Sequence, residues 1–169
     1  MRHTISILVE NKFGVLTRIS GLFSGRGFNI HSLNVAPTHI PELSRMTIVT
    51  EGDEATLEQI VKQLKKLIDV REVMDYREGE SINRELVLVQ VRNTSDNRAE
   101  IMQITDVFRA KVVDVHHHCL TIEITGSESK ISKFISLMET FGINKINRTG
   151  QIALPRIDPD STPDTGTGA

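Results

Sequence analysis

The sequence lacks several features on which whole classes of protein depend. It has no tryptophan and only 4% aromatic residues, so a core has to be built from Ile, Leu and Val. A single cysteine, Cys119, excludes an internal disulfide framework and fits a reducing compartment. No apolar run approaches the roughly 20 residues that span a bilayer, and no signal-peptide pattern precedes the first strand pattern. We therefore expect a cytoplasmic protein with no membrane partner.

A strong charge of one sign is also missing. The net charge of −2 gives nothing that would attract nucleic acid or an anionic membrane surface. The 38% hydrophobic and 25% charged residues are ordinary for a globular protein and too apolar for a disordered one. A chain of 169 residues suits one domain or two small ones. Two thin cores would gain from burying surface against a second copy.

One order of secondary-structure elements occurs twice along the chain. Alternating apolar residues predict strands, and apolar residues spaced three or four apart predict amphipathic helices. Both halves give the order β-α-β-β-α-β, which we interpret as two copies of one topology. The first copy has expected strands at 4–10, 28–35, 43–50 and 70–75, with helices at 15–23 and after Asp53. The second has expected strands at 86–91, 111–115, 120–125 and 143–147, with helices at 99–108 and from Ser127 or Glu128.

The repeated order predicts an α+β fold made of two ferredoxin-like βαββαβ domains in tandem. Two β-α-β units with right-handed crossovers place both helices on one face of a four-stranded antiparallel sheet. The first domain is expected over 1–76 and the second over 84–157. The polar stretch 77–83 is predicted to be a linker. Residues 158–169, rich in Pro, Thr, Gly and Asp, are predicted to be a disordered tail.

The most informative stretch is the junction of the first strand with the first helix, Asn11-Lys12-Phe13-Gly14-Val15-Leu16. The first N–H groups of a helix have no partners within it, so they can receive a carboxylate. Gly14 would let a ligand approach the backbone closely, and Asn11 offers both a donor and an acceptor. The simpler interpretation of the pattern is that Gly14 shapes a tight turn and Asn11 caps the helix.

The second expected strand carries several polar residues. In a ferredoxin-like sheet this strand lies at an edge, and an exposed edge can pair with another chain. Asn29 stands at its start, and His31 and Asn34 follow. Ordinary turn and surface residues are the more common alternative for all three.

Three consecutive histidines, His116, His117 and His118, suggest metal binding at first sight. Neighbours on a strand point to opposite faces, so His116 and His118 could share an ion with only Cys119 nearby as a further ligand. A solvated hairpin turn is the simpler interpretation, and we expect no native metal site. No nucleophile–base set, P-loop or dinucleotide motif occurs in a recognisable context, so no catalytic residues are expected.

A dense set of residues in the first half is similar to one known family. These residues are Asn11-Lys12-Phe13-Gly14-Val15-Leu16-Thr17-Arg18-Ile19, Gly21-Leu22-Phe23, Arg26-Gly27-Phe28-Asn29-Ile30, Ser32-Leu33, Val35 and Leu43-Ser44-Arg45-Met46-Thr47-Ile48. The pattern resembles the small regulatory subunits of acetolactate synthase (acetohydroxyacid synthase), whose N-terminal part is an ACT domain, a ligand-sensing module. Beyond Tyr76 the resemblance rests on Arg84-Glu85-Leu86 and Asp114-Val115, while the histidines and the tail depart from the family.

The resemblance implies a function for the chain. It implies a non-catalytic homodimer in branched-chain amino acid biosynthesis, which activates a separate catalytic large subunit and confers feedback inhibition by valine or a related amino acid. No cofactor is implied in this chain, and thiamine diphosphate, Mg and FAD are expected only in the catalytic partner. The effector-binding residues carried over by position are Asn11, Gly14, Val15, Leu16, Asn29 and Ile30, with Asn29 supplied by a second protomer.

Other functions stay open at this point. The chain could be an ACT-type regulator of a different enzyme, or a self-sufficient enzyme that uses a metal at His116 and His118. An RNA-binding ferredoxin-like domain would need exposed aromatic residues on its sheet and basic surroundings. A transcription regulator would need a helix-turn-helix segment, and no such pattern accompanies the two domains.

Overall fold

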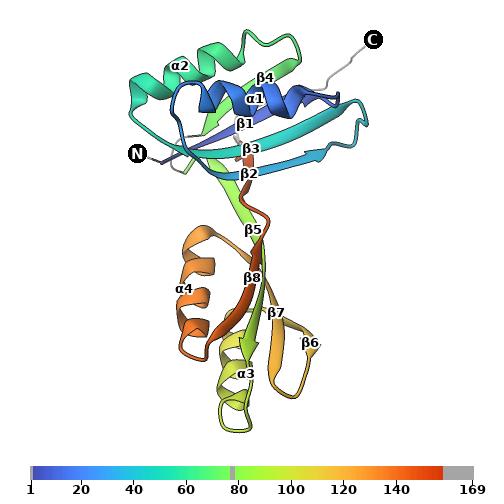
Figure 1. Ribbon diagram of the computed structural model, residues 1–169, viewed down its shortest axis with the longest axis vertical. Coiled ribbons are helices and arrows are strands. Elements are labelled where there is room, and N and C mark those ends of the chain that lie inside the picture. Colours follow the sequence, from blue (N-terminus) through green and yellow to red (C-terminus); the bar gives the residue numbers. More distant parts are fainter. Residues whose placement is uncertain (1, 77–78, 158–169) are drawn as a thin grey trace.

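Two units of the same topology follow one another in the computed structural model, which describes residues 2–76 and 79–157 (Figure 1). The N-terminal unit consists of β1 (Arg2–Glu10), α1 (Val15–Ser24), β2 (Ile30–Pro37), β3 (Leu43–Glu51), α2 (Glu54–Leu64) and β4 (Val70–Tyr76). The C-terminal unit consists of β5 (Ser81–Arg92), α3 (Arg98–Val107), β6 (Lys111–Val115), β7 (Cys119–Gly126), α4 (Glu128–Glu139), β8 (Ile143–Arg148) and β9 (Ile152–Pro155).

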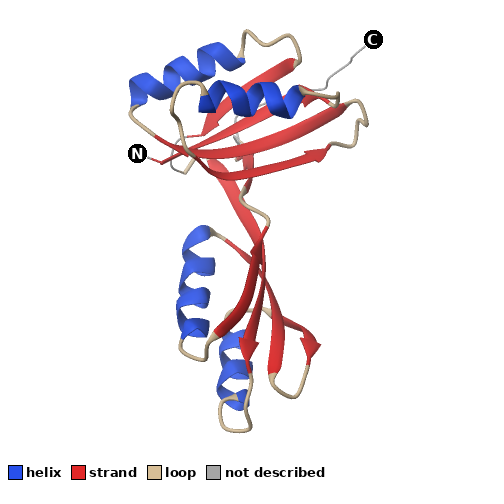
Figure 2. Ribbon diagram, in the orientation of Figure 1, coloured by secondary structure: helices blue, strands red, loops and turns tan. Residues whose placement is uncertain are grey.

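The N-terminal unit is an antiparallel sheet in the order β2-β3-β1-β4. Figure 2 shows both of its helices on one face of this sheet. Ile5 and Ile7 alternate along β1 towards that face and are fully buried with Phe23 of α1. The predicted ferredoxin-like arrangement is confirmed, and so is the position of β2 at an edge of the sheet.

The C-terminal unit repeats the arrangement with the order β6-β7-β5-β8. Val87, Val89 and Val91 alternate along β5 and are fully buried beneath α3 and α4. Phe134 of α4 completes this core and packs edge-on against Phe108, with ring centroids 5.4 Å apart. The α+β fold with two ferredoxin-like domains in tandem is therefore confirmed.

The end of α1 explains why β2 begins later than the sequence pattern predicts. Gly27 has a φ of +74°, in the left-handed region that glycine adopts at little cost. The N–H of Phe28 then donates to the carbonyl of Phe23 at 3.0 Å. A hydrogen bond across five residues is typical of the C-terminus of a helix that ends with a left-handed glycine. Because this amide completes α1, it does not join the sheet, and β2 starts at Ile30 rather than at Phe28.

The linker predicted over 77–83 is wrong in its second part. Residues 81–83 are the beginning of β5, where they pair with β9, Ser81 opposite Pro155 and Asn83 opposite Ala153. In Figure 1, β5 runs from the N-terminal unit down into the second sheet, and β8 leads back up towards β9. Residues 77–78 and the tail predicted over 158–169 lie outside the described residues. Among the described helices, none has the length and apolar character needed to cross a membrane.

Candidate functional site

The junction between β1 and α1 is held by hydrogen bonds to the turn that joins β2 and β3. The backbone N–H of Asn11 donates to the carbonyl of Glu42 at 2.7 Å. Its side-chain amide nitrogen donates to the carbonyl of Pro41 at 3.0 Å. Two hydrogen bonds, one from the backbone and one from the side chain, thus hold Asn11 against this turn. Its side-chain oxygen is the atom that could accept a hydrogen bond from an ammonium group.

Gly14 occupies the first position before α1 and has a φ of +83°. Side chains are disfavoured in this left-handed conformation, so the turn itself requires glycine. A Cβ built on Gly14 would meet no atom within 4 Å, which shows open space above its backbone. The turn-shaping role and an approach route for a ligand are therefore both compatible with this glycine.

The first turn of α1 has no side-chain cap, and no acidic residue stands in it. By contrast, Asp53 accepts a hydrogen bond from the backbone N–H of Thr56 at the start of α2, at 2.7 Å. The unpaired amides at the start of a helix carry a partial positive charge. Beside them, the Val15 side chain is buried in the core and Leu16 is exposed. The start of α1 therefore offers a carboxylate-binding end next to apolar surface.

The basic side chains around this junction are paired with carboxylates. Lys12 and Arg71 both form ion pairs with Glu10, and the Lys12 hydrogen bond, with help from Arg71, lowers the pKa of that carboxyl group. Arg18 pairs with Asp69, at 2.7 Å between Nη2 and Oδ2. Because these cations are already neutralised, the helix amides supply the attraction for an anion here.

Asn29 and Ile30 lie at the other end of the sheet from Gly14. Ile30 is paired with Thr50, whose hydroxyl donates to the carbonyl of Asn29 at 2.8 Å. Thr50 in turn pairs with His3 at the start of β1, whereas Gly14 follows the end of β1. A strand of nine residues spans roughly 27 Å. One chain thus brings together Asn11, Gly14, Val15 and Leu16, and it places Asn29 and Ile30 far from them.

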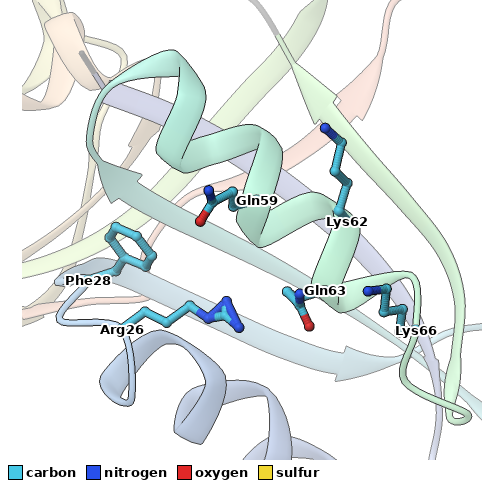
Figure 3. A pocket seen from close by; sticks show the side chains of 6 residues that line it. All are labelled: Arg26, Phe28, Gln59, Lys62, Gln63 and Lys66. Carbon is cyan, nitrogen blue, oxygen red and sulfur yellow. The ribbon is translucent and has the colours of Figure 1, made fainter.

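A separate hollow of about 670 Å³ lies between the α1–β2 turn and α2. Figure 3 shows the side chains that line it, which are Arg26, Phe28, Gln59, Lys62, Gln63 and Lys66. Its basic residues surround the carboxyl ends of α1 and α2, where exposed carbonyl groups favour cations. Lys62 also pairs with Glu58 at 3.2 Å. Helix electrostatics account for these cations, and the hollow includes none of the predicted effector residues.

The three histidines form the tip of the β6–β7 hairpin. The backbone N–H of His116 donates to the carbonyl of Cys119 at 2.9 Å, and all three imidazoles are exposed. The ring centroids of His116 and His118 are 6.1 Å apart. Within residues 2–76 and 79–157, no group of three His, Cys, Asp or Glu side chains is placed to hold a metal ion. The predicted hairpin turn is confirmed.

Contacts between the two units were not predicted from the sequence. The backbone N–H of Gln151 donates to the Ser32 hydroxyl at 3.1 Å, and the Asn34 side chain donates to the carbonyl of Thr149 at 3.3 Å. Each pair is separated by more than 100 residues along the chain. The available signals were Gly150, which lies between the two contact points, and the polar residues on an edge strand.

Comparisons with known proteins cover both units. Residues 5–72 match the family described as the AHAS small subunit-like ACT domain, and residues 84–157 match the family described as the small subunit of acetolactate synthase. The "Probable acetolactate synthase small subunit" of Archaeoglobus fulgidus is 51% identical over 156 residues, which are 92% of this chain and 98% of that protein. The acetolactate synthase small subunit of Mycolicibacterium smegmatis is 47% identical over 154 residues, 91% of each chain.

A solved structure also resembles the whole chain. The crystal structure of the acetolactate synthase small subunit from Thermotoga maritima matches with a TM-score of 0.87 and 39% sequence identity. The match covers 94% of this chain and 99% of that one, so it includes both units and their connection.

Proposed function

The chain belongs to the family of acetolactate synthase small subunits, and from that premise we propose that it is the regulatory subunit of this enzyme in branched-chain amino acid biosynthesis. In this proposal it binds and activates a separate catalytic large subunit and is not itself catalytic. The thiamine diphosphate, Mg and FAD of the reaction belong to that partner. Valine, or a related branched-chain amino acid, binds the ACT domain and inhibits the complex. The family match over both units supports the proposal.

The observation that carries the sensing role is the open, uncapped start of α1 at Gly14. The carboxylate of a free amino acid would accept hydrogen bonds from the first amides of the helix. The oxygen of the Asn11 side chain would accept from its ammonium group. An aliphatic side chain would contact the exposed Leu16. A branched-chain amino acid satisfies these three requirements together.

A second copy of the chain would complete this site. If two copies pair antiparallel through their β2 edges, the start of one β2 lies beside the end of the other. The end of β2, with Pro37 opposite Ser44, is at the same end of the sheet as Glu10 opposite Leu43. Such a homodimer would therefore bring Asn29 and Ile30 of one copy towards Gly14 of the other. Two equivalent sites per dimer follow from the symmetry.

Effector binding inhibits the complex if the effector favours one geometry of the dimer, and if the catalytic subunit is less active with that geometry than with the other. Such couplings typically amount to about 1–3 kcal/mol. The coupling is reciprocal, so the catalytic subunit should alter the affinity of the regulatory dimer for the effector by the same factor.

Reconstitution tests the proposal directly. The purified chain alone should show no turnover of pyruvate with thiamine diphosphate. Adding the catalytic subunit should produce more activity than that subunit has alone, and valine, isoleucine or leucine should then inhibit. All three are titrated because one methylene changes affinity in an apolar pocket by only about 1–3 kcal/mol. Amino acid binding without any effect on this catalytic subunit would instead favour a regulator of a different enzyme.

A further inference from the structure

The edge strand of the ACT domain is hydrogen-bonded to the C-terminal unit. The hydroxyl of Ser32 accepts from the backbone N–H of Gln151 at 3.1 Å, and the side-chain nitrogen of Asn34 donates to the carbonyl of Thr149 at 3.3 Å. The acceptor Ser32 and the donor Asn34 both belong to β2 of the ACT domain. Residues 149–151 form the turn between β8 and β9. We call these five residues the β2 clasp.

Gly150 lets the two segments of the β2 clasp approach one another. Its φ is +78°, and a Cβ built on it would lie 2.5 Å from the hydroxyl oxygen of Ser32. Real Cβ atoms essentially never approach another atom so closely, so a side chain at this position would displace the Ser32 hydroxyl, the turn or both. In each case the contact between Ser32 and the turn would be disturbed. The glycine is thus required twice, for the backbone conformation and for the close contact.

The β2 clasp also contacts the start of α4 through Gln151. Gln151 is only 6% exposed, and its side-chain nitrogen donates to the carboxylate of Glu128 at 3.0 Å. Glu128 is the first residue of α4 and also pairs with Arg2 of β1. A displacement of residue 151 therefore reaches both a helix of the C-terminal unit and the first strand of the ACT domain.

The β2 clasp is also hydrogen-bonded to the sheet of the C-terminal unit through Thr149. The Thr149 hydroxyl accepts from the backbone N–H of Leu86 on β5 at 3.1 Å. Arg148, the residue before it, makes a bidentate ion pair with Glu85, with 2.8 Å from Nε to Oε1 and 2.7 Å from Nη2 to Oε2. These contacts make the turn move with the C-terminal unit rather than as a free loop.

The side chains of the β2 clasp lie on the face of β2 that is opposite to the helices. Side chains alternate along a strand, so Ser32 and Asn34 point away from the face on which Leu33 packs into the core. The pairing of β2 with β3 shifts register between Ile30 and Ser32, which places a bulge at His31. Bulges are sites where a strand can change its bend and twist.

We propose that Ser32, Asn34 and Gly150 are positioning residues that transmit effector occupancy from the ACT domain to the C-terminal unit. This inference rests on the proposed function, because Ile30 is the first residue of β2 and Asn29 precedes it. When an effector and a second copy engage the start of β2, the strand adjusts at its bulge and shifts Ser32. The buried Gln151 N–H would then lose its acceptor, so the turn follows the strand. The response reaches β5, β8 and α4 through contacts that do not touch the effector.

Variants of the β2 clasp test this route in the complete complex with the catalytic subunit. Ser32→Ala and Asn34→Ala each remove one hydrogen bond, and Gly150→Ala places a Cβ against the Ser32 hydroxyl and so disturbs its bond to Gln151. The double variant Ser32→Ala/Gly150→Ala removes the oxygen that the new Cβ would strike, and it controls for a folding defect in Gly150→Ala. Gly79→Ala is the matched control for backbone strain, because Gly79 has a φ of +88° and open space around it.

The expected result separates binding from inhibition. In calorimetry on the small subunit alone, all clasp variants should bind valine as the wild type does, and in the complex they should still activate the catalytic subunit. The effect of saturating valine on activity should fall by about fivefold or more, which is the lower end of usual allosteric couplings. Gly79→Ala should be inhibited as the wild type is. Wild-type inhibition in well-folded Ser32→Ala and Asn34→Ala complexes would overturn the inference.

Hydrogen exchange on the small subunit alone gives a second readout. Valine should slow exchange of the Gln151 amide and of β9 in the wild type, and this change should be absent in Ser32→Ala. A wild type that binds valine without any change in these amides would also overturn the inference while leaving the proposed function intact. A wild type that neither binds branched-chain amino acids nor activates the catalytic subunit would refute the proposed function itself.

Discussion

Gly14 and Asn29 lie at opposite ends of one β-sheet. Gly14 follows the end of β1, while Asn29 precedes Ile30, which pairs with Thr50 near the start of β1. A free amino acid is far shorter than the strand between them, which is roughly 27 Å long. One chain can therefore offer only half of the proposed site, which needs a second copy of the chain to be complete.

Gly14→Asp should abolish feedback inhibition while leaving activation of the catalytic subunit largely intact. The new carboxylate would stand where the effector's carboxylate is proposed to bind, and aspartate tolerates the left-handed backbone better than most residues. Losing charge-assisted hydrogen bonds at about 1.5–3 kcal/mol should raise the half-inhibiting valine concentration by about 10- to 100-fold or more, so that valine concentrations that half-inhibit the wild type have no measurable effect on the variant. Valine titration of the reconstituted enzyme measures this, with Gly79→Asp as the control. Full valine sensitivity in Gly14→Asp would place the site elsewhere.

Glu10→Gln should lower stability at neutral pH but not in acid. The pKa of Glu10 is lowered from its ordinary value of 4.5, chiefly by the hydrogen bond from Lys12. A carboxyl group whose pKa is lower in the folded state stabilises the fold above its unfolded pKa, and this contribution disappears as the pH falls through the folded value. Urea midpoints of wild type and variant should therefore differ at pH 7, and the difference should shrink as the pH falls below 4.5 and disappear below the lowered pKa of the folded state. A difference that stays constant down to pH 3 would contradict the assignment.

Arg148→Met should destabilise the C-terminal unit by about 3 kcal/mol, because Glu85 would keep a buried charge without its partner. The Glu85 side chain is only 3% exposed, and its hydrogen bond raises the pKa of Arg148. The double variant Glu85→Met/Arg148→Met should recover most of the loss, since it leaves no uncompensated charge. Denaturant unfolding measures all three proteins. A double variant as unstable as the single one would show that the loss comes from packing rather than charge.

Much of the fold could be predicted because local patterns and burial agree. Val87, Val89 and Val91 alternate in the sequence and are buried in the structure, and Asp53 caps α2 as its position indicates. β9 could not be predicted from the sequence, because its large apolar residues face solvent and its small residue is buried. Ala153 is buried, whereas Ile152 and Leu154 are exposed. β9 pairs with the start of β5, which is about 70 residues away along the chain. The hydrophobic periodicity of a short segment does not indicate such a distant partner.

The candidate site was predictable in part for a similar reason. Gly14 is required by a local backbone conformation, so the sequence marks it. The hydrogen bond from Asn11 to Pro41 depends on a turn 30 residues away, and the contact of Ser32 with Gln151 spans 119 residues. Such long-range contacts are set by how strands and units pack, and single residues in the sequence do not specify them.

Each proposed effector site is shared between two copies of the chain, and mixed dimers test this sharing. Chains carrying Gly14→Asp and chains carrying Asn29→Asp are combined, and dimers that contain one of each are isolated with two affinity tags. Each pure variant dimer has two damaged sites, whereas the mixed dimer joins the intact Gly14 of one chain to the intact Asn29 of the other. Calorimetry should find one valine bound per mixed dimer with wild-type affinity, against two in the wild type and none in either variant dimer. Mixed dimers that bind no more valine than the variant dimers would show that the two chains do not share a site.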